Sequence, residues 1–209
     1  MNHLVLLGDS IFDNAAYVEG GPAVIEQVKQ WVPSNWQASL LAVDGDTAEL
    51  VYKQLLRLPP DLTHLVLSVG GNDALVCIPQ LEKPVSSVKQ GLVLLTKIKA
   101  EFQVRYQRLI CTLLTLDKPL LVCTIYDQVP GLPAELVMAL GMFNDVILRE
   151  AIQNRLPVLD LRVICNEIQD YSVVSPIEPS SSGGAKLVER MVSALLRHDF
   201  TKRECHVYV

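Results

Sequence analysis

Five short runs of apolar residues are spaced along the chain, and most are followed by polar or glycine-rich segments. Runs of this length, rich in Val, Ile and Leu, are typical of strands buried on both faces of a parallel sheet. The predicted strands cover residues 3–7, 39–43, 64–69, 120–125 and 158–161.

Between these runs, apolar residues recur at intervals of three and four, as on one face of an amphipathic helix. The helical spacing covers residues 24–32, 88–113, 136–151 and 187–196. The stretch 86–116 is long for a single helix and contains Gly91, so the pattern leaves open whether it forms one helix or two.

Alternating strands and helices with right-handed crossovers predict a parallel sheet that is covered by helices on both faces. The expected fold class is therefore α/β, a three-layer α/β/α sandwich with a five-stranded parallel sheet. Residues 1–198 are expected to form one domain, and residues 199–209 a C-terminal tail without a core-facing pattern. Loops rich in Pro, Gly or Ser are predicted at residues 127–133 and 170–184.

Composition places the chain among globular proteins and narrows its partners. Half of the 209 residues are hydrophobic and a fifth are charged, which argues against disorder. The net charge is −5 and no basic run exceeds Lys202-Arg203, so nucleic acid is not an expected partner. No apolar run reaches the roughly eighteen residues of a membrane span, and the first residues lack a basic region and a cleavage site. We therefore expect a soluble cytoplasmic protein; its oligomeric state is not indicated.

Cysteine spacing and glycine patterns argue against several kinds of site. The cysteines are odd in number and form no CxxC pair, so they indicate neither a disulfide framework nor a zinc site. No phosphate-binding glycine loop with a lysine is present, and the carboxylates show no recognisable ligand spacing. We expect no cofactor and no metal. The five cysteines are Cys77, Cys111, Cys123, Cys165 and Cys205.

Polar and glycine residues follow four of the five predicted strands. In an open parallel sheet, ligands bind outside the carboxyl ends of the strands, so these segments are expected to meet at one edge. They are Gly8-Asp9-Ser10, Asp44-Gly45-Asp46, Gly70-Gly71-Asn72-Asp73 and the loop with Glu178-Pro179.

Ser10 is the candidate nucleophile, because it directly follows a strand and can present both its hydroxyl and its backbone N–H at the sheet edge. Gly45 lacks a side chain and can offer a bare amide to a developing oxyanion. Asn72 can add a side-chain N–H from the neighbouring strand end. These three donors could surround one point.

In order and spacing, these segments resemble the SGNH or GDSL-type hydrolases. The resemblance rests on Gly8-Asp9-Ser10, Gly45, Gly71-Asn72-Asp73 and the late proline-containing loop, and it covers nearly the whole chain. It implies a flavodoxin-like sheet and ester hydrolysis through an acyl-serine intermediate on Ser10. The implied oxyanion hole consists of the Ser10 and Gly45 amides with the Asn72 side chain. Substrates in this family are small-molecule esters that range from short acyl esters, lysophospholipids and thioesters to acetylated sugars.

The last motif departs from the family pattern, which has an aspartate, two further residues and a histidine usually followed by proline. Alignment on Pro179 and Gly183-Gly184 places Ser175 at the aspartate position and Glu178 at the histidine position. Both partners of the serine are therefore replaced.

No histidine of the sequence is expected to lie close enough to Ser10 to act as its general base. His3 and His64 open the first and third predicted strands, roughly 15 to 20 Å from the active edge. His198 ends the last predicted helix, where it suits the helix dipole. His206 lies in the tail, and nothing in the sequence brings it to the site.

Glu178 is the candidate general base. A glutamate with an ordinary pKa of about 4.3 is a weaker base than a histidine with a pKa of about 6.5, but burial can raise it. A carboxylate has no tautomer to fix and becomes neutral on protonation, so it needs no acidic partner. The first hypothesis is thus an ester hydrolase with an altered base. The alternative is a catalytically silent protein of the same fold that binds an ester or acetylated-sugar-like ligand.

Most other polar residues near this edge are expected to have structural roles. Asp9 and Asp73 are expected to hold loops through hydrogen bonds to the backbone. Asp13-Asn14 is expected to cap the next segment or to line the pocket. Asp127 and Asp170 remain candidates for a substitute acid.

Overall fold

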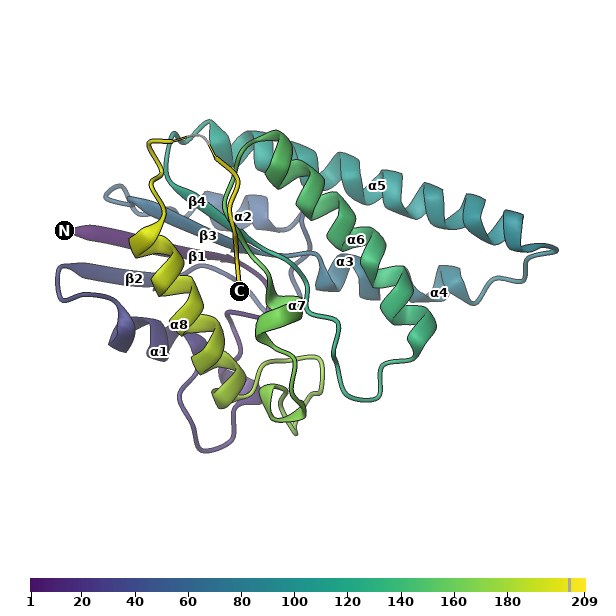
Figure 1. Cartoon of the computed structure of the whole chain (residues 1–209), viewed down its shortest axis with the longest axis horizontal. Coiled ribbons are helices and arrows are strands. Elements are labelled where there is room, and N and C mark those ends of the chain that lie inside the picture. The colour runs from purple at the N-terminus through teal and green to yellow at the C-terminus, as the bar shows by residue number, and fades with distance from the viewer. Residues whose placement is uncertain (203) are drawn as a thin grey trace.

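A parallel sheet of six strands lies at the centre of the computed structural model, which describes residues 1–202 and 204–209 (Figure 1). The strand order is β2-β1-β3-β4-β5-β6. The predicted α/β class is confirmed. The strands are β1 (Asn2–Gly8), β2 (Trp36–Leu40), β3 (His64–Ser68), β4 (Leu120–Cys123), β5 (Val158–Leu159) and β6 (Val207–Tyr208).

Helices cover both faces of the sheet and complete the three layers (Figure 1). Helices α1 (Val24–Trp31) and α8 (Ser181–Arg197) cover one face. The long helices α5 (Val88–Leu114) and α6 (Ala134–Gln153) cover the other. The shorter helices are α2 (Val51–Leu55), α3 (Gly71–Leu75), α4 (Ile78–Leu81) and α7 (Leu161–Ile164), with 3-10 turns at Ala15–Tyr17 and Ile168–Asp170.

Side chains of β1 alternate between the two faces of the sheet. Leu4 and Leu6 pack in the core that includes α1 and α8, whereas Val5 and Leu7 pack in the core that includes α5 and α6. All four are fully buried, and each contributes roughly 1.5–3 kcal/mol by burial. The strand that carries the candidate nucleophile at its end is thus fixed from both sides.

Strand β2 begins and ends three residues earlier than predicted. Trp36 pairs with Asn2 and Leu40 with Leu6, so the partly polar start of the strand was missed. Residues 41–43 still run beside β1, because Val43 N–H donates to the Gly8 carbonyl, but they leave the regular ladder.

Helix α5 is continuous over 27 residues, which settles the question about the segment 86–116. Ser87 caps its start, since the Ser87 hydroxyl accepts a hydrogen bond from Gln90 N–H. Gly91 lies in the first turn of the helix, so it does not interrupt the buried apolar face that begins at Ile98.

Helix α8 begins inside the segment predicted to be a loop. Ser180 caps it by accepting from Gly183 N–H, and Gly183 and Gly184 form its first turns. A Cβ atom on Gly183 would lie 2.0 Å from the Asp170 carbonyl oxygen. The glycines therefore allow close packing of α8 and do not signal a flexible loop.

Strand β6 is the sixth strand, which the sequence pattern missed. Val207 pairs with Val158 and Tyr208 with Leu159, so part of the predicted tail extends the sheet at the β5 edge. Only two residues are in the strand, too few to produce a recognisable alternation. The division into a domain of residues 1–198 and a tail of residues 199–209 stays a prediction.

Candidate active site

Gly8 makes the sharp turn that leads from β1 to Ser10. Its φ of +130° is unfavourable for residues with a side chain, and an added Cβ atom would lie 1.7 Å from the Ser68 carbonyl oxygen. Asp9 N–H donates to that same oxygen at 3.1 Å. The end of β1 is thus held tightly against the end of β3, and Ser10 follows at the carboxyl edge of the sheet.

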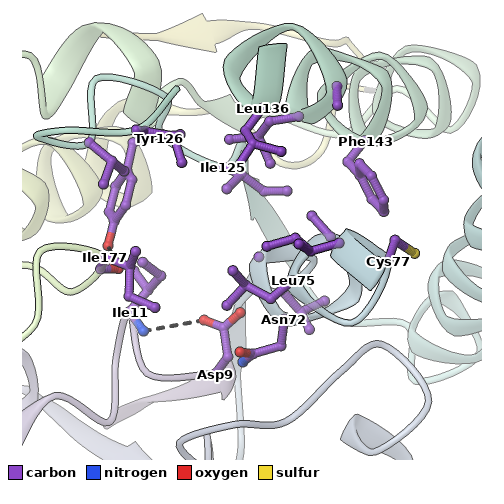
Figure 2. Close-up of a pocket in the computed structure, with 18 of the residues that line it drawn as sticks. Asp9, Ile11, Asn72, Leu75, Cys77, Ile125, Tyr126, Leu136, Phe143 and Ile177 are labelled. Atoms are coloured by element: carbon purple, nitrogen blue, oxygen red, sulfur yellow. Dashed lines mark hydrogen bonds between the residues drawn. The ribbon is translucent and has the colours of Figure 1, made fainter. Parts of the chain in front are cut away.

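Asp9 holds the turn together from inside. Its Oδ1 accepts a hydrogen bond from Ile11 N–H at 3.2 Å, which is the dashed line in Figure 2. Its carbonyl oxygen accepts from the N–H groups of Phe12 and Asp13. Burial raises the pKa of the Asp9 carboxyl well above its usual range. Asp9 therefore has the loop-holding position expected of it.

Gln54 is a site-shaping residue that the sequence pattern did not reveal. This fully buried side chain accepts from Gly8 N–H at 2.9 Å and donates to the Gly8 carbonyl at 2.7 Å. Its Nε2 also donates to the Asp46 carboxylate at 2.8 Å. Gln54 therefore ties the nucleophile turn to the Gly45 loop, and no motif in the sequence signals such a bridge.

Ser10 and Glu178 form a direct pair. The Ser10 hydroxyl donates a hydrogen bond to Glu178 Oε1 at 2.9 Å across 168 positions of sequence. Both side chains are almost entirely shielded, with 6% of Ser10 and 4% of Glu178 exposed. The second oxygen of Glu178, Oε2, has no hydrogen-bond partner within the part of the chain that the structure describes. The carboxylate of Glu178 thus lies within hydrogen-bond reach of the hydroxyl of the candidate nucleophile.

The pKa of Glu178 is raised from 4.5 to about 7. Burial is the main cause, because a buried carboxylate loses hydration. The hydrogen bond from Ser10 partly offsets this effect, and the negative charge of Asp44 adds to it. A carboxyl group tuned in this way has a proton affinity close to that of an ordinary histidine.

The loop that carries Glu178 is anchored on both sides of the residue. The Tyr126 hydroxyl donates to the Ile177 carbonyl at 2.6 Å. Asn14 Nδ2 donates to the Pro179 carbonyl at 3.1 Å, and Asn14 Oδ1 accepts from Val24 N–H, the first residue of α1. Asn14 therefore binds the start of a helix, as expected, and also positions the Glu178 loop.

Ser175, at the position of the family's aspartate, takes part in the loop through its backbone. Its carbonyl oxygen accepts from Glu178 N–H at 3.0 Å. The two other candidate acids bond elsewhere: Asp170 forms an ion pair with Lys186 at 2.8 Å, and Asp127 accepts from Gln128. Glu178 and Ser10 thus form a dyad, to which neither Asp127 nor Asp170 is bonded.

Two of the three residues that offer candidate oxyanion donors line one pocket together with Glu178. Ser10 and Asn72 line the same pocket, and Asn72 Nδ2 donates one hydrogen bond to the Asp46 carbonyl at 3.1 Å, which leaves its second hydrogen available. Gly45 lies in the adjacent exposed loop with a φ of +82° and is not among the pocket-lining residues. In residues 1–202 and 204–209, the N–H groups of Ser10 and Gly45 donate no hydrogen bond.

Each histidine bonds to residues away from the site, as its position in the sequence suggested. The pairs are His3 with Asp61 and Ser39, His64 with Thr63, His198 with Tyr208, and His206 with Glu204. No group of three or more His, Cys, Asp or Glu side chains suited to a metal ion occurs within the described residues.

An apolar pocket opens beside the dyad. Figure 2 shows Asp9 and Asn72 at one end of it and Cys77 and Phe143 at the other. Ser10 and Glu178 also line it, and most of the remaining lining comes from α3, α4, α6 and the segment between β4 and α6. The periodicity of α6 predicted its apolar face but not that part of this face lines a pocket.

The sequence profile of the GDSL-like Lipase/Acylhydrolase family matches residues 6–183. This range runs from the nucleophile strand to the first turn of α8 and includes both Ser10 and Glu178. The chain belongs to this family. No curated protein matches the sequence.

Solved structures share the fold of this GDSL-like protein at low sequence identity. A lipase from a goat rumen metagenome superposes with a TM-score of 0.72 at 15% identity, over 93% of this chain and 97% of that one. An acetyl xylan esterase gives 0.66 at 19% identity, over 92% and 99%. An extracellular lipase from Streptomyces rimosus gives 0.67 at 15% identity, over 94% and 99%. No helix in the described residues is long and apolar enough to cross a membrane.

Proposed function

We propose that this GDSL-like protein hydrolyses small-molecule carboxylic esters, with Ser10 as nucleophile and Glu178 as general base. The observation that carries the proposal is the 2.9 Å hydrogen bond from the Ser10 hydroxyl to Glu178 Oε1. This distance lies within the reach required of a nucleophile and its base. The raised pKa of Glu178 supports it, because a base near neutral pKa accepts the serine proton more readily.

The reaction follows from these positions. Glu178 takes the hydroxyl proton as Ser10 Oγ attacks the ester carbonyl, and it becomes a neutral carboxylic acid. It then donates this proton to the departing alkoxide, which leaves as the alcohol, while the acyl group stays on Ser10. In the second half, Glu178 takes a proton from water and the resulting hydroxide attacks the acyl carbonyl. The bond between this carbonyl carbon and Ser10 Oγ then breaks, Glu178 returns the proton to Ser10 Oγ, and the acyl group leaves as the carboxylic acid.

The negative charge of the tetrahedral intermediate needs hydrogen-bond donors. We assign the backbone N–H groups of Ser10 and Gly45 and the side chain of Asn72 to this task. Support comes from the two backbone N–H groups, which donate no hydrogen bond in the described part of the chain, and from the free hydrogen on Asn72 Nδ2. Removing one such donor typically costs a factor of about 100 to 1000 in kcat.

The second candidate is a silent binding protein of the same fold. The observation in its favour is that Ser175 and Glu178 stand where the family has aspartate and histidine. Such a protein would keep the apolar pocket and bind an ester or acetylated-sugar-like ligand without turnover.

Two measurements separate the candidates: hydrolysis of a p-nitrophenyl ester series and covalent labelling by a fluorophosphonate, which reports an activated serine without requiring a matched substrate. Ser10→Ala is expected to abolish labelling, and Glu178→Gln to lower both labelling rate and kcat/KM by about 100-fold to 10,000-fold. The matched controls are Ser86→Ala and Glu189→Gln, whose parent side chains are exposed. Absence of both labelling and hydrolysis in the wild type would contradict the hydrolase and favour the binding protein. Undiminished turnover in Glu178→Gln would exclude Glu178 as the base.

A further inference from the structure

We propose that the apolar pocket binds the acyl chain of the ester, and that it selects chains of roughly four to six carbons over acetyl. This inference rests on the proposed function, since it specifies the acyl group that Ser10 would receive. It starts from the continuity of the pocket with the dyad: Ser10 and Glu178 line the same cavity as the apolar side chains of α4 and α6.

The walls of the pocket suit an aliphatic chain. Helix α6 supplies Leu136, Ala139 and Leu140 to the lining, while Leu75 comes from α3 and Ile125 from the segment after β4. Figure 2 shows Leu75, Ile125 and Leu136 between the polar and the apolar ends. A methylene chain that moves from water into this pocket gains apolar contacts, which favours binding by about 0.8 kcal/mol per buried CH₂.

The far end of the pocket is closed by buried side chains. Cys77, Ile98 and Phe143 line this region with exposures of 7%, 2% and 3%. The Cys77 thiol, between α3 and α4, donates its hydrogen to the Asp73 carbonyl and therefore has no free donor to offer the pocket. An acyl chain that enters beside Ser10 therefore ends against apolar atoms.

The size of the cavity sets the expected chain length. Its volume is about 110 Å³. Apolar cavities of about 150 Å³ take up a benzene ring, so this space holds roughly four to six carbons. An acetyl group would leave most of the cavity unfilled.

The distribution of polar groups argues against a sugar or a charged group in this cavity. None of the described residues that line it is Lys, Arg or His. The charged and hydroxyl or amide side chains of the lining lie on segments at the carboxyl ends of strands or on the loop that carries Glu178. They are Asp9, Ser10, Ser68, Asn72 and Glu178. The Tyr126 hydroxyl is occupied by the Ile177 carbonyl. A sugar hydroxyl placed among the α6 side chains would lose its hydrogen bonds to water without replacement.

The test compares p-nitrophenyl acetate with p-nitrophenyl hexanoate. The wild type is expected to show a kcat/KM at least about tenfold higher for hexanoate. Ala139→Phe, which fills the cavity, is expected to lower the hexanoate-to-acetate ratio by about tenfold. The matched control is Ala134→Phe, the same change at an exposed position of α6 outside the pocket, which leaves the ratio unchanged.

A binding measurement keeps this proposal separate from the proposed function. Ser10→Ala is titrated with methyl hexanoate and with methyl acetate, and its thermal midpoint is recorded. A rise with hexanoate alone supports the acyl pocket, even where the wild type hydrolyses neither ester. Ser10-dependent hydrolysis with equal or higher kcat/KM for acetate would overturn the acyl pocket while leaving ester hydrolysis intact. Equal binding of the two esters, or binding of neither, would overturn it as well.

Discussion

Asn14 joins the segment that carries Ser10 directly to the loop that carries Glu178, because its side-chain Nδ2 donates to the carbonyl oxygen of Pro179 at 3.1 Å. Asn14 is fully buried and lies four positions after Ser10, while Pro179 directly follows Glu178. A second hydrogen bond between the same two segments therefore lies beside the Ser10–Glu178 pair and helps to hold it together.

Replacement of this donor is expected to loosen the dyad. Asn14→Asp keeps the oxygen that accepts from Val24 N–H and removes the donor to Pro179. We expect kcat to fall about tenfold, with a smaller change in KM, because misplacement of a base affects the chemical step more than binding. The added carboxylate is also expected to raise the apparent pKa of the rate profile.

Steady-state kinetics from pH 5 to 9 measure both effects, and Asn35→Asp, at an exposed asparagine, is the matched control. A simple loss of folded protein would lower kcat without moving the apparent pKa. An unchanged pH profile would mean that Asn14 has only a structural role.

The pH dependence of hydrolysis is expected to follow Glu178. The base must be ionised, so activity is expected to rise with pH through an apparent pKa of about 7 and then level off. The carboxyl groups of Asp9 and Asp44 also act on Glu178, so the observed value belongs to this group of acids. A rate profile that is already flat at pH 5 would contradict a buried glutamate base.

The same burial is expected to make Glu178 a source of instability at high pH. Its folded pKa is raised from 4.5 to about 7, so the folded state binds the proton more tightly than the unfolded state does. The resulting stabilisation is present below pH 4.5 and is lost as pH rises through about 7. At pH 8, Glu178→Gln should therefore be more stable than the wild type, by up to about 3 kcal/mol.

Urea unfolding at pH 4 and pH 8 measures this difference. The advantage of Glu178→Gln is expected to shrink toward pH 4, where the wild-type carboxyl is protonated. Glu189→Gln, at an exposed position of α8, is expected to show no such trend. If the two variants behave alike, the burial of Glu178 does not disfavour its charge.

Gly8→Ala is expected to destabilise the fold strongly. The new methyl group would overlap the Ser68 carbonyl oxygen, at 1.7 Å, in addition to the strain of a φ of +130°. Gly131→Ala is the control, because Gly131 also has a positive φ, +75°, but no atom lies within 4 Å of an added Cβ. We expect a loss of at least about 3 kcal/mol for Gly8→Ala and about 1 kcal/mol for Gly131→Ala in urea unfolding. Similar losses would show that strain, not overlap, dominates at Gly8.

Features that depend on local pattern were predicted well. The buried strands β1, β3 and β4 and the helices α5 and α6 have long or strongly apolar signals, and the order of the motifs placed Ser10 and Glu178 at one edge of the sheet. The hydrogen bond between Ser10 and Glu178 shows that the two side chains are in direct contact there. The roles of Gly45 and Asn72 stay predictions, because they concern charge that develops only during reaction.

Features that depend on tertiary contact were missed. Gln54 carries no motif, and its importance comes only from the approach of α2 to the Gly8 turn. Strand β6 is too short for a periodic signal, and the glycines of α8 suggested a loop because their close packing on Asp170 cannot be read from sequence. The apolar pocket likewise exists only once α4 and α6 face each other.

The wide separation of Ser10 and Glu178 along the chain affects when the protein becomes competent during its synthesis. Ser10 emerges from the ribosome 168 positions before Glu178. The base loop is then fixed as α8 docks on α1, where Gln27 donates to the Ser181 carbonyl at 2.9 Å. A nascent chain therefore carries Ser10 without Glu178, and under the proposed mechanism it does not turn over esters before the Glu178 loop and α8 have been translated.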